Sequence, residues 1–418
     1  MLNILVIGSG AREAMIVRKL SESKQNSNIY CLGTSRNPYI DKKTNLYVHD
    51  FILTDIVLKF INENLIDFAI IGPEVPLRDG ISNLLENNDI PCIGPLKIYA
   101  QIETSKIFAR KFIDKIGLSN YSPNYIVFNN NYEKIKSFSE SKKIVVKYDG
   151  LHSGKGVKVQ GVDFNDFSEI DISNINDNVI FEEKLEGEEF SLISVTDGNG
   201  RIQHFPPIQD YKRLLNNDLG PNTGSMGCLI NNNNSLDFLN ENDIFLAEKI
   251  NKQIIDNLNS FGKIKNYRPG YRGFIYGSYI KTKDDKLYII EFNCRLGDPE
   301  GIILLNMLKN DFLELCLELT SGYLKTDLEF RKNASLGVYL VPKNYPKKTY
   351  EKYDIYINKS LNKQNIVYGN VEEDIKELHL YSLSSRSLFY FVEGTSILDC
   401  RNKLYNDIKL VNGNLHYR

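Results

Sequence analysis

The chain has 418 residues, of which 42% are hydrophobic and 25% charged, a balance typical of a globular protein with about two to four packed units. Its formal net charge of -2 gives no general attraction to nucleic acid or to an anionic membrane, so any positive patch must be local. No apolar run approaches the roughly 18 residues of a membrane helix, and six scattered cysteines without a Cys-x-x-Cys pair argue against a disulfide framework or a zinc site.

Residues 1–100 alternate short apolar strands with helical segments. The chain opens on an apolar strand without a basic leader, which predicts a cytoplasmic protein. Strands are expected at 2–8, 28–32, 68–71 and 91–94, and helices at 12–23, 55–64 and 77–87. Such alternation predicts a parallel α/β sheet, and Pro95 marks the exit from this Rossmann-like unit.

The rest of the chain reads as an α+β region followed by a β-rich one. A helix at 104–117 carries Lys106 and precedes a strand-rich stretch, and two paired strands precede a helix at 311–321. The expected strands lie at 125–128, 144–148, 157–160, 179–183, 273–281 and 287–293. Residues 329–418 form a small β-rich domain in this interpretation.

The first glycine motif is Gly8-Ser9-Gly10-Ala11-Arg12-Glu13, where a strand turns into a helix N-terminus, a natural anion site. A dinucleotide fingerprint requires a small residue in place of Glu13 and an acidic residue about 20 positions on, and neither is present. A nicotinamide dehydrogenase is therefore disfavoured. Binding of another phosphate and a plain tight turn both stay open.

The second motif, 147–156 (KYDGLHSGKG), resembles a Walker A loop but has the wrong spacing and is followed by a strand. A glycine loop between two antiparallel strands is better interpreted as a flap. Its backbone amides, including those of Gly154 and Gly156, would close over polyphosphate, with added charge from Lys155. The alternative is an ordinary hairpin.

The third motif is Glu291-Phe292-Asn293-Cys294-Arg295 at the end of an apolar strand. With a period of two, Glu291, Asn293 and Arg295 share one face. Hard oxygen ligands of this kind suit Mg²⁺, and the guanidinium suits a transferring phosphoryl group. A solvated strand face with a Glu–Arg pair is the alternative, although the carboxylates of Asp298 and Glu300 close by make it less attractive.

The acidic segment after the strand at 179–183 has two interpretations as well. It is either solvated surface or a hinge whose backbone meets an adenine edge, with Glu189 near ribose hydroxyls. The hinge residues would be Glu182, Glu183, Lys184 and Leu185.

These pieces, in this order, resemble the ATP-grasp superfamily, and the finer resemblance is to the glycinamide ribonucleotide synthetase (phosphoribosylamine–glycine ligase) family. It covers nearly the whole chain. The segments that carry it are 71–77 (IGPEVPL), 146–150 (VKYDG), 154–157 (GKGV), 209–213 (QDYKR), 220–227 (GPNTGSMG) and 291–300 (EFNCRLGDPE). The fourth and fifth are more specific to the family, whereas the Glu-x-Asn-x-Arg strand is common to the superfamily.

The resemblance implies an ATP-grasp fold in three parts: an N-terminal Rossmann-like domain (1–100), an ATP-grasp domain (101–328) with a mobile lid at about 124–188, and a C-terminal domain (329–418). It implies ligation of glycine to 5-phosphoribosylamine by a monomer, with ATP as co-substrate and Mg²⁺ (or Mn²⁺) on Glu291 and Asn293. Lys106, Lys147, Lys155 and Arg295 would surround the phosphates. The glycine and sugar side would comprise Gly10, Glu74, Asp210, Lys212, Arg213, Asn222, Thr223, Gly224, Gly297 and Asp298.

The chain departs from the family pattern mainly on the sugar side, at Ala11, Ala14, Tyr39, Tyr211 and Ser225, the last in place of a usual glycine. Substrate affinity or identity is the property these changes affect. The rivals are another ATP-grasp carboxylate–amine ligase or carboxylase, a non-catalytic nucleotide-binding relative and, last, a Rossmann oxidoreductase.

Overall fold

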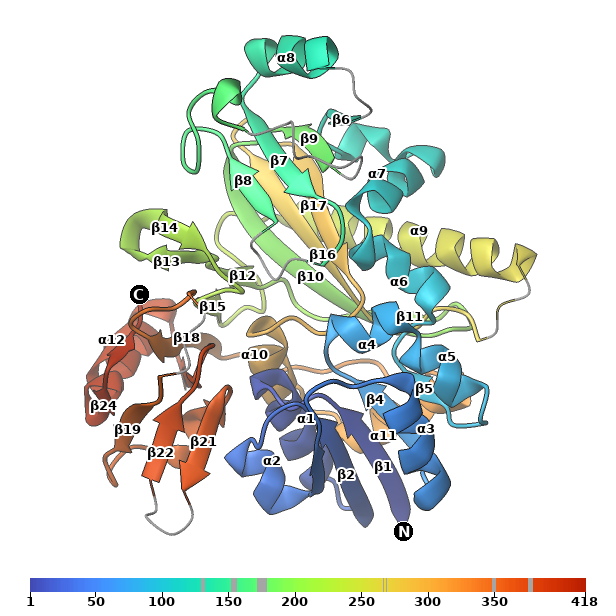
Figure 1. The fold of residues 1–418 in the computed structure, drawn as a ribbon, viewed down its shortest axis with the longest axis vertical. Coiled ribbons are helices and arrows are strands. Elements are labelled where there is room, and N and C mark those ends of the chain that lie inside the picture. Colours follow the sequence, from blue (N-terminus) through green and yellow to red (C-terminus); the bar gives the residue numbers. More distant parts are fainter. Residues whose placement is uncertain are drawn as a thin grey trace.

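The computed structural model describes residues 1–128, 132–151, 156–170, 179–265, 267, 269–347, 351–374 and 379–418. Figure 1 shows an N-terminal unit in blue, a central sheet, a small sheet above it in green, and a C-terminal segment in orange and red. Within those ranges no helix is both long and apolar enough to cross a membrane.

The N-terminal unit is built on a five-stranded sheet in the order β3-β2-β1-β4-β5, in which every pair is parallel. The parallel sheet is therefore confirmed. The central strand β1 is buried from Ile4 to Ile7 because helices cover both faces. The elements are β1 (Leu2–Ile7), α1 (Ala11–Ser21), β2 (Ser27–Gly33), α2 (Pro38–Lys43), β3 (Asn45–Val48), α3 (Thr54–Glu63), β4 (Phe68–Ile71), α4 (Glu74–Asp79), α5 (Ile81–Glu86) and β5 (Cys92–Ile93).

Two helices predicted from the sequence have different bounds in the structure. The segment 77–87 lies in α4 and α5, because Gly80 between them has φ 85°, a left-handed conformation that interrupts a helix. The helix predicted at 104–117 begins later in the structure, as α7 (Lys106–Lys115), and is preceded by α6 (Lys97–Thr104). Ser105 separates them, and its hydroxyl caps α7 by accepting from Phe108 N.

The predicted lid contains an antiparallel sheet in the order β6-β9-β7-β8 and one helix, α8 (Tyr132–Ser141). Its own small core includes Ile144, Val146 and Phe181. The flap sequence joins the antiparallel strands β7 and β8, as predicted. The strands are β6 (Tyr125–Val127), β7 (Ile144–Tyr148), β8 (Val157–Val159) and β9 (Val179–Glu183).

The central sheet has the order β11-β10-β16-β17, all antiparallel. Helix α9 (Glu241–Ile264) covers it with Ile250 and Ile254, and α7 contacts both β17 and β9, so the sheet and the predicted lid share a helix. The strands are β10 (Gly187–Asp197), β11 (Ile202–His204), β16 (Arg272–Thr282) and β17 (Leu287–Asn293).

A β-bulge in β17 decides which side chains face the adjoining cavity. Ile289 lies opposite Tyr279 and Glu291 lies opposite Ser278, so Ile290 is one extra residue without a partner on β16. The bulge shifts the alternation of side chains by one. Leu287 and Ile289 are buried before it and Phe292 and Cys294 after it, which leaves Glu291 and Asn293 on the opposite face.

The C-terminal segment completes a sheet that begins in the middle of the chain. The order β12-β15-β18-β23-β20 joins two short strands from the predicted ATP-grasp domain to three later ones. These strands are β12 (Gln209–Asp210), β15 (Gly227–Ile230), β18 (Ala334–Pro342), β20 (Ile366–Tyr368) and β23 (Leu388–Gly394). The loops between β12 and β15 are therefore anchored on C-terminal strands.

The remaining elements lie in several parts of the molecule. A second sheet has the order β21-β22-β19-β24, and β13 and β14 pair with each other as a separate two-stranded hairpin (Figure 1). They are β13 (Arg213–Leu215), β14 (Leu219–Asn222), α10 (Glu300–Met307), α11 (Phe312–Ser321), β19 (Tyr353–Ile357), β21 (Val371–Asp374), β22 (His379–Ser382), α12 (Ile397–Asp407), β24 (Val411–Gly413) and β25 (Leu415–His416), which pairs with β18.

Candidate active site

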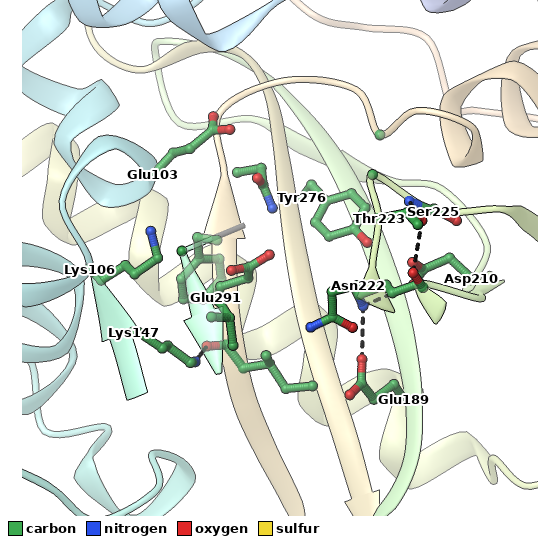
Figure 2. A pocket seen from close by; sticks show the side chains of 18 of the residues that line it. Glu103, Lys106, Lys147, Glu189, Asp210, Asn222, Thr223, Ser225, Tyr276 and Glu291 are labelled. Carbon is green, nitrogen blue, oxygen red and sulfur yellow. Dashed lines mark hydrogen bonds and ion pairs between the residues drawn. The ribbon is translucent and has the colours of Figure 1, made fainter. Parts of the chain in front are cut away.

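A cavity of about 890 Å³ lies between the predicted lid, the central sheet, the N-terminal unit and the C-terminal segment. Figure 2 shows Glu291 in it, with Lys106 and Lys147 on one side and Asp210 on the other. The structure thus brings together the predicted site residues that it describes. These are Gly10, Glu74, Lys106, Lys147, Gly156, Glu182, Glu183, Lys184, Leu185, Glu189, Asp210, Lys212, Arg213, Asn222, Thr223, Gly224, Glu291, Asn293, Arg295, Gly297 and Asp298. Gly154 and Lys155 lie outside the described residues.

Lys147, at the end of β7, is held by a buried carboxylate. Its Nζ lies 2.6 Å from Glu182 Oε2 and donates to Ile290 O, the carbonyl of the bulge, at 3.3 Å. Arg110 binds the same carboxylate with two hydrogen bonds of 2.6 and 2.9 Å. Burial alone would raise the pKa of Glu182, but these two cations hold it at about 2. The anionic side chain of Glu182 is therefore fully engaged within the protein.

Lys106 begins α7 and extends from a capped helix end. Asp149 accepts hydrogen bonds from Lys106 N at 2.6 Å and from the hydroxyl of Ser105 at 3.0 Å. The ammonium of Lys106 donates to Gly150 O at 2.7 Å, at the start of the flap sequence. Burial lowers the pKa of Lys106. An anion bound next to the ammonium would act in the opposite direction and favour its charged form.

Glu291 and Asn293 present one carboxylate and one amide oxygen on the cavity face of β17. Among the described residues, no group of three or more His, Cys, Asp or Glu side chains is placed to hold a metal ion. Two oxygen ligands from the protein suit Mg²⁺, which keeps several waters and usually takes further oxygens from substrate phosphates. The donor set therefore fits a hard divalent ion bound together with a nucleotide.

Arg295 is held at the base of this face by two carboxylates. Its Nε lies 3.0 Å from Glu74 Oε2 and its Nη2 lies 3.0 Å from Glu103 Oε1, while Nη2 also donates to Asn293 Oδ1 at 3.2 Å. The guanidinium lowers the pKa of Glu74 to about 2, whereas burial raises that of Glu103 to about 7. The ion pairs fix Arg295 beside the proposed metal ligand Asn293.

On the other side of the cavity, Lys212 lies between two acids. Its Nζ is 2.8 Å from Glu189 Oε2 and 3.3 Å from Asp210 Oδ1. Burial raises the pKa of Asp210. The neighbouring loop is tied to the same residue, since Thr223 donates through its N–H and its hydroxyl to Lys212 O, each at 2.8 Å.

Arg213 connects the β13–β14 hairpin with the predicted lid. Its Nη1 lies 3.2 Å from Asp163 Oδ1 and donates to Gly220 O at 3.0 Å. The pair brings a residue predicted on the substrate side into contact with the lid.

A buried acid closes the far wall at the start of α10. Glu300 is 3% exposed, and Oε1 accepts from the Tyr276 hydroxyl at 2.9 Å. A Cβ at Gly297 would lie 2.4 Å from Glu300 Oε2, so a larger residue there would require Glu300 to move. Burial raises the pKa of Glu300 to about 7.

The N-terminal glycine motif is occupied by its own glutamate. Glu13 Oε2 accepts from Gly10 N at 2.7 Å, and Arg12 Nε lies 2.7 Å from Glu13 Oε1. A Cβ at Gly72 would lie 1.9 Å from Glu13 Oε1 and one at Gly8 would lie 2.8 Å from Glu13 Cδ, so these two glycines leave room for this side chain. The carboxylate satisfies the N-terminus of α1, where a dinucleotide phosphate would otherwise lie. This arrangement argues against the oxidoreductase alternative, although Gly10 still lines the cavity.

Several cavity residues were not predicted from the sequence. Among them are Arg12, Glu13, Glu103, Arg110, Tyr276, Tyr345 and Arg386, whereas Glu300 was noted from the sequence only as a carboxylate close to the predicted metal-binding strand. Glu103 and Arg110 were detectable in principle, because each is a charged residue within the apolar stripe of a helix, a position that requires a buried partner. Arg386 carries no comparable local signal.

Comparison with known proteins agrees with this arrangement. Residues 2–103 match the model of the phosphoribosylglycinamide synthetase N domain, and residues 104–301 match that of its ATP-grasp (A) domain. Curated relatives named phosphoribosylamine–glycine ligase include those of Methanocella arvoryzae (32% identical) and Methanocaldococcus jannaschii (34%). Each alignment covers 100% of this chain and 95% of the relative.

Solved structures show the same fold. The phosphoribosylamine–glycine ligase of Thermotoga maritima aligns with a TM-score of 0.80 at 25% identity, over 100% of this chain and 99% of that one. A biotin carboxylase of Campylobacter jejuni aligns with a TM-score of 0.71 at 13% identity, over 99% and 92%, a likeness of fold alone.

The fold and the cavity define an ATP-grasp ligase, a class that acts on small molecules with ATP and a divalent metal ion. Within that class, the chain belongs to the phosphoribosylglycinamide synthetase family.

Proposed function

We propose that this chain joins glycine to 5-phosphoribosylamine, converting ATP to ADP and phosphate and giving glycinamide ribonucleotide through glycyl phosphate. One observation carries the proposal. Within a single cavity, cations suited to binding phosphate and oxygens suited to binding a metal ion face the Asp210–Arg213 and Asn222–Gly224 loops. The chain that forms this cavity belongs to the phosphoribosylglycinamide synthetase family. The metal ion would be Mg²⁺ or Mn²⁺.

In the first step, the glycine carboxylate attacks the γ-phosphate of ATP and ADP leaves. Two anions must approach each other, so Lys106, Lys147 and Arg295 supply positive charge around the phosphates. A divalent ion on Glu291 and Asn293, when bound, neutralises further phosphate charge. Lys147 needs no reorganisation for this task, because Glu182 and the bulge carbonyl already fix its ammonium.

In the second step, the sugar amine attacks the carbonyl carbon of glycyl phosphate. The C–N bond forms, the C–O bond breaks with its electron pair leaving on the phosphate, and the proton lost by the amine goes to that departing phosphate. Water would hydrolyse the acyl phosphate, which gives the predicted lid its purpose. Asp210, Lys212 and the 222–224 loop would line the glycine and sugar side, together with Gly297 and Asp298.

For the nucleotide, the proposed hinge is 182–185. Arg110 and Lys147 already bind the side chain of Glu182. The hinge would therefore contact adenine through the backbone groups of residues 182–185. Glu189 would accept from ribose hydroxyls while it keeps its pair with Lys212.

The experiment measures ADP release with Mg²⁺-ATP, glycine and freshly prepared 5-phosphoribosylamine, omitting each in turn. Full turnover should require all three, and ATP with glycine alone should give at most slow release. Stimulation by bicarbonate or a second amino acid, and not by 5-phosphoribosylamine, would contradict the proposal. We further propose that the active species is a monomer that requires no nucleic acid. Sedimentation of the protein at the assay concentration, without added nucleic acid, tests this.

A further inference from the structure

Arg386 lies between β22 and β23 in the C-terminal segment and reaches two cavity loops at once. Its Nη1 donates to Asp298 O at 2.7 Å and to Ser225 O at 3.2 Å, and also to Gly224 O. Its Nη2 donates to Asp298 Oδ2 at 2.7 Å. One guanidinium thus links the 222–225 loop to the turn that contains Asp298.

Two tyrosines of the same segment reinforce the link. The Tyr339 hydroxyl donates to Asp298 Oδ1, and its ring lies under the Arg386 guanidinium at 4.5 Å. The Tyr345 hydroxyl accepts from Gly224 N at 3.4 Å. Both carboxylate oxygens of Asp298 are therefore held by C-terminal side chains.

The backbone of Arg386 is itself fixed. Asn370 N donates to Arg386 O at 2.8 Å, and Asn370 Oδ1 accepts from Ser385 N at 3.0 Å. A Cβ at Gly224 would lie 3.2 Å from Arg386 Cζ, so a side chain at this position would crowd the guanidinium. Such preorganisation is what a positioning residue requires.

We infer that Arg386 is a positioning residue for the amine acceptor, fixing the 222–225 loop and Asp298 as the wall against which 5-phosphoribosylamine binds. The inference rests on the proposed function. It assigns to the C-terminal segment a role in the chemistry of a site whose phosphate-binding cations, Lys106 and Lys147, come from other parts of the chain.

The position of the Arg386 contacts favours a role in binding the amine acceptor rather than ATP. Figure 2 places Thr223 and Ser225 across the cavity from Lys106 and Lys147, with Glu291 between them. Asp298 is engaged by Arg386 and Tyr339 and so serves as a fixed wall. Loss of Arg386 would free this loop and this turn without altering the contacts of Lys106 or Lys147.

Arg18 on α1 offers a matched control. It too donates to C-terminal carbonyls, Gln364 O at 2.7 Å and Ile366 O at 2.8 Å, and it too lies over a tyrosine ring, that of Tyr39 at 5.2 Å. It does not line the cavity. Arg18→Ala thus removes a similar link to the C-terminal segment away from the site.

The test compares Arg386→Ala, Arg386→Lys and Arg18→Ala with the unchanged chain by steady-state ADP release and thermal unfolding. For Arg386→Ala, the KM for 5-phosphoribosylamine should rise at least about tenfold, while the KM for ATP stays within about twofold. Arg386→Lys should restore little of the lost affinity for 5-phosphoribosylamine. An ammonium does not have the two NH2 groups with which the guanidinium contacts the loop and the turn together. Arg18→Ala should leave all KM values unchanged.

Other outcomes overturn the inference. Parallel rises in every KM, a rise for glycine alone, or equal effects of Arg18→Ala would each remove the acceptor role. So would an unaltered KM for the sugar amine in a folded Arg386→Ala protein. If the unchanged chain shows no turnover with 5-phosphoribosylamine, the proposed function fails first, which keeps the two failures distinguishable.

Discussion

Lys147 Nζ lies 2.6 Å from Glu182 Oε2, and both side chains are buried between the predicted lid and the central sheet. Arg110 completes the group with two hydrogen bonds to the same carboxylate. One acid thus fixes a cation on the lid strand β7 to a cation on α7. The cavity keeps an ordered ammonium at the end of β7 because Glu182 neutralises the surrounding positive charge.

Glu182→Gln should destabilise the protein strongly. The substitution leaves Arg110 and Lys147 without their anion in a buried place, which typically costs about 3–5 kcal/mol. Urea unfolding followed by circular dichroism measures the loss. The adjacent Glu183→Gln is the control, because Glu183 pairs with the more exposed Lys142 and should cost about 1 kcal/mol or less. Equal losses would contradict the ranking.

The pH dependence of stability provides a second check on Glu182. Its pKa is lowered from an ordinary value near 4.5 to about 2 in the folded chain. Its contribution is therefore complete above pH 4.5 and is lost as the pH falls toward 2. The difference in unfolding free energy between the unchanged chain and Glu182→Gln should shrink over that interval. A difference that stays constant would exclude the ion pair as its cause.

Local patterns in the sequence predicted four of the five strands of the N-terminal sheet, with β3 missed, as well as the lid strands and the shared face of Glu291 and Asn293. Runs such as 68–71 and 144–148 match the structure at both ends, because β-branched residues bounded by turns determine a strand locally. The bulge at Ile290 was not predicted, since it depends on registry with β16. Without it, period-two alternation would place Glu291 on the buried side with Leu287 and Ile289.

Several of the unpredicted cavity residues have roles that depend on distant partners. Glu103 accepts from Cys294 N and pairs with Arg295, and Arg386 reaches Asp298 across 88 positions. No window of sequence contains both members of such a pair. The assigned roles of the cavity residues, including Lys155 in the flap, stay predictions.

Glu300→Gln should change the pH dependence of stability in the opposite sense to Glu182→Gln. The pKa of Glu300 is raised from an ordinary value near 4.5 to about 7, so its contribution is complete below pH 4.5 and is lost as the pH rises to 7. Above pH 7 the glutamine variant should be the more stable by up to about 3 kcal/mol. Unfolding at pH 5 and pH 8.5 checks this, and an equal difference at both values would contradict it.

Ser225 occupies a backbone position that favours glycine. Its φ is 88°, and its hydroxyl donates to Gly227 O at 3.1 Å. Ser225→Gly should relieve strain of order 1 kcal/mol and lose a hydrogen bond of similar worth, leaving stability nearly unchanged. Ser225→Val should cost about 2 kcal/mol or more, because a β-branched residue tolerates this φ poorly. Thermal unfolding of both variants decides, and equal midpoints would show that the backbone is unstrained.

The last prediction concerns the metal. Glu291→Gln retains the size of the side chain but replaces one oxygen with an NH2 group and removes the charge that a hard divalent ion prefers. We expect ADP release to fall about 100-fold or more at moderate Mg²⁺, since charge stabilisation by such an ion is worth several kcal/mol, and we expect higher Mg²⁺ to recover part of it. Glu291 is only partly buried on the cavity face of β17, so the unfolding midpoint should barely change. Glu314→Gln on the exposed face of α11 controls for loss of one carboxylate. Near-normal ADP release by Glu291→Gln at moderate Mg²⁺ would end the assignment, and an equal loss in Glu314→Gln would show that net charge, not ligation, is responsible.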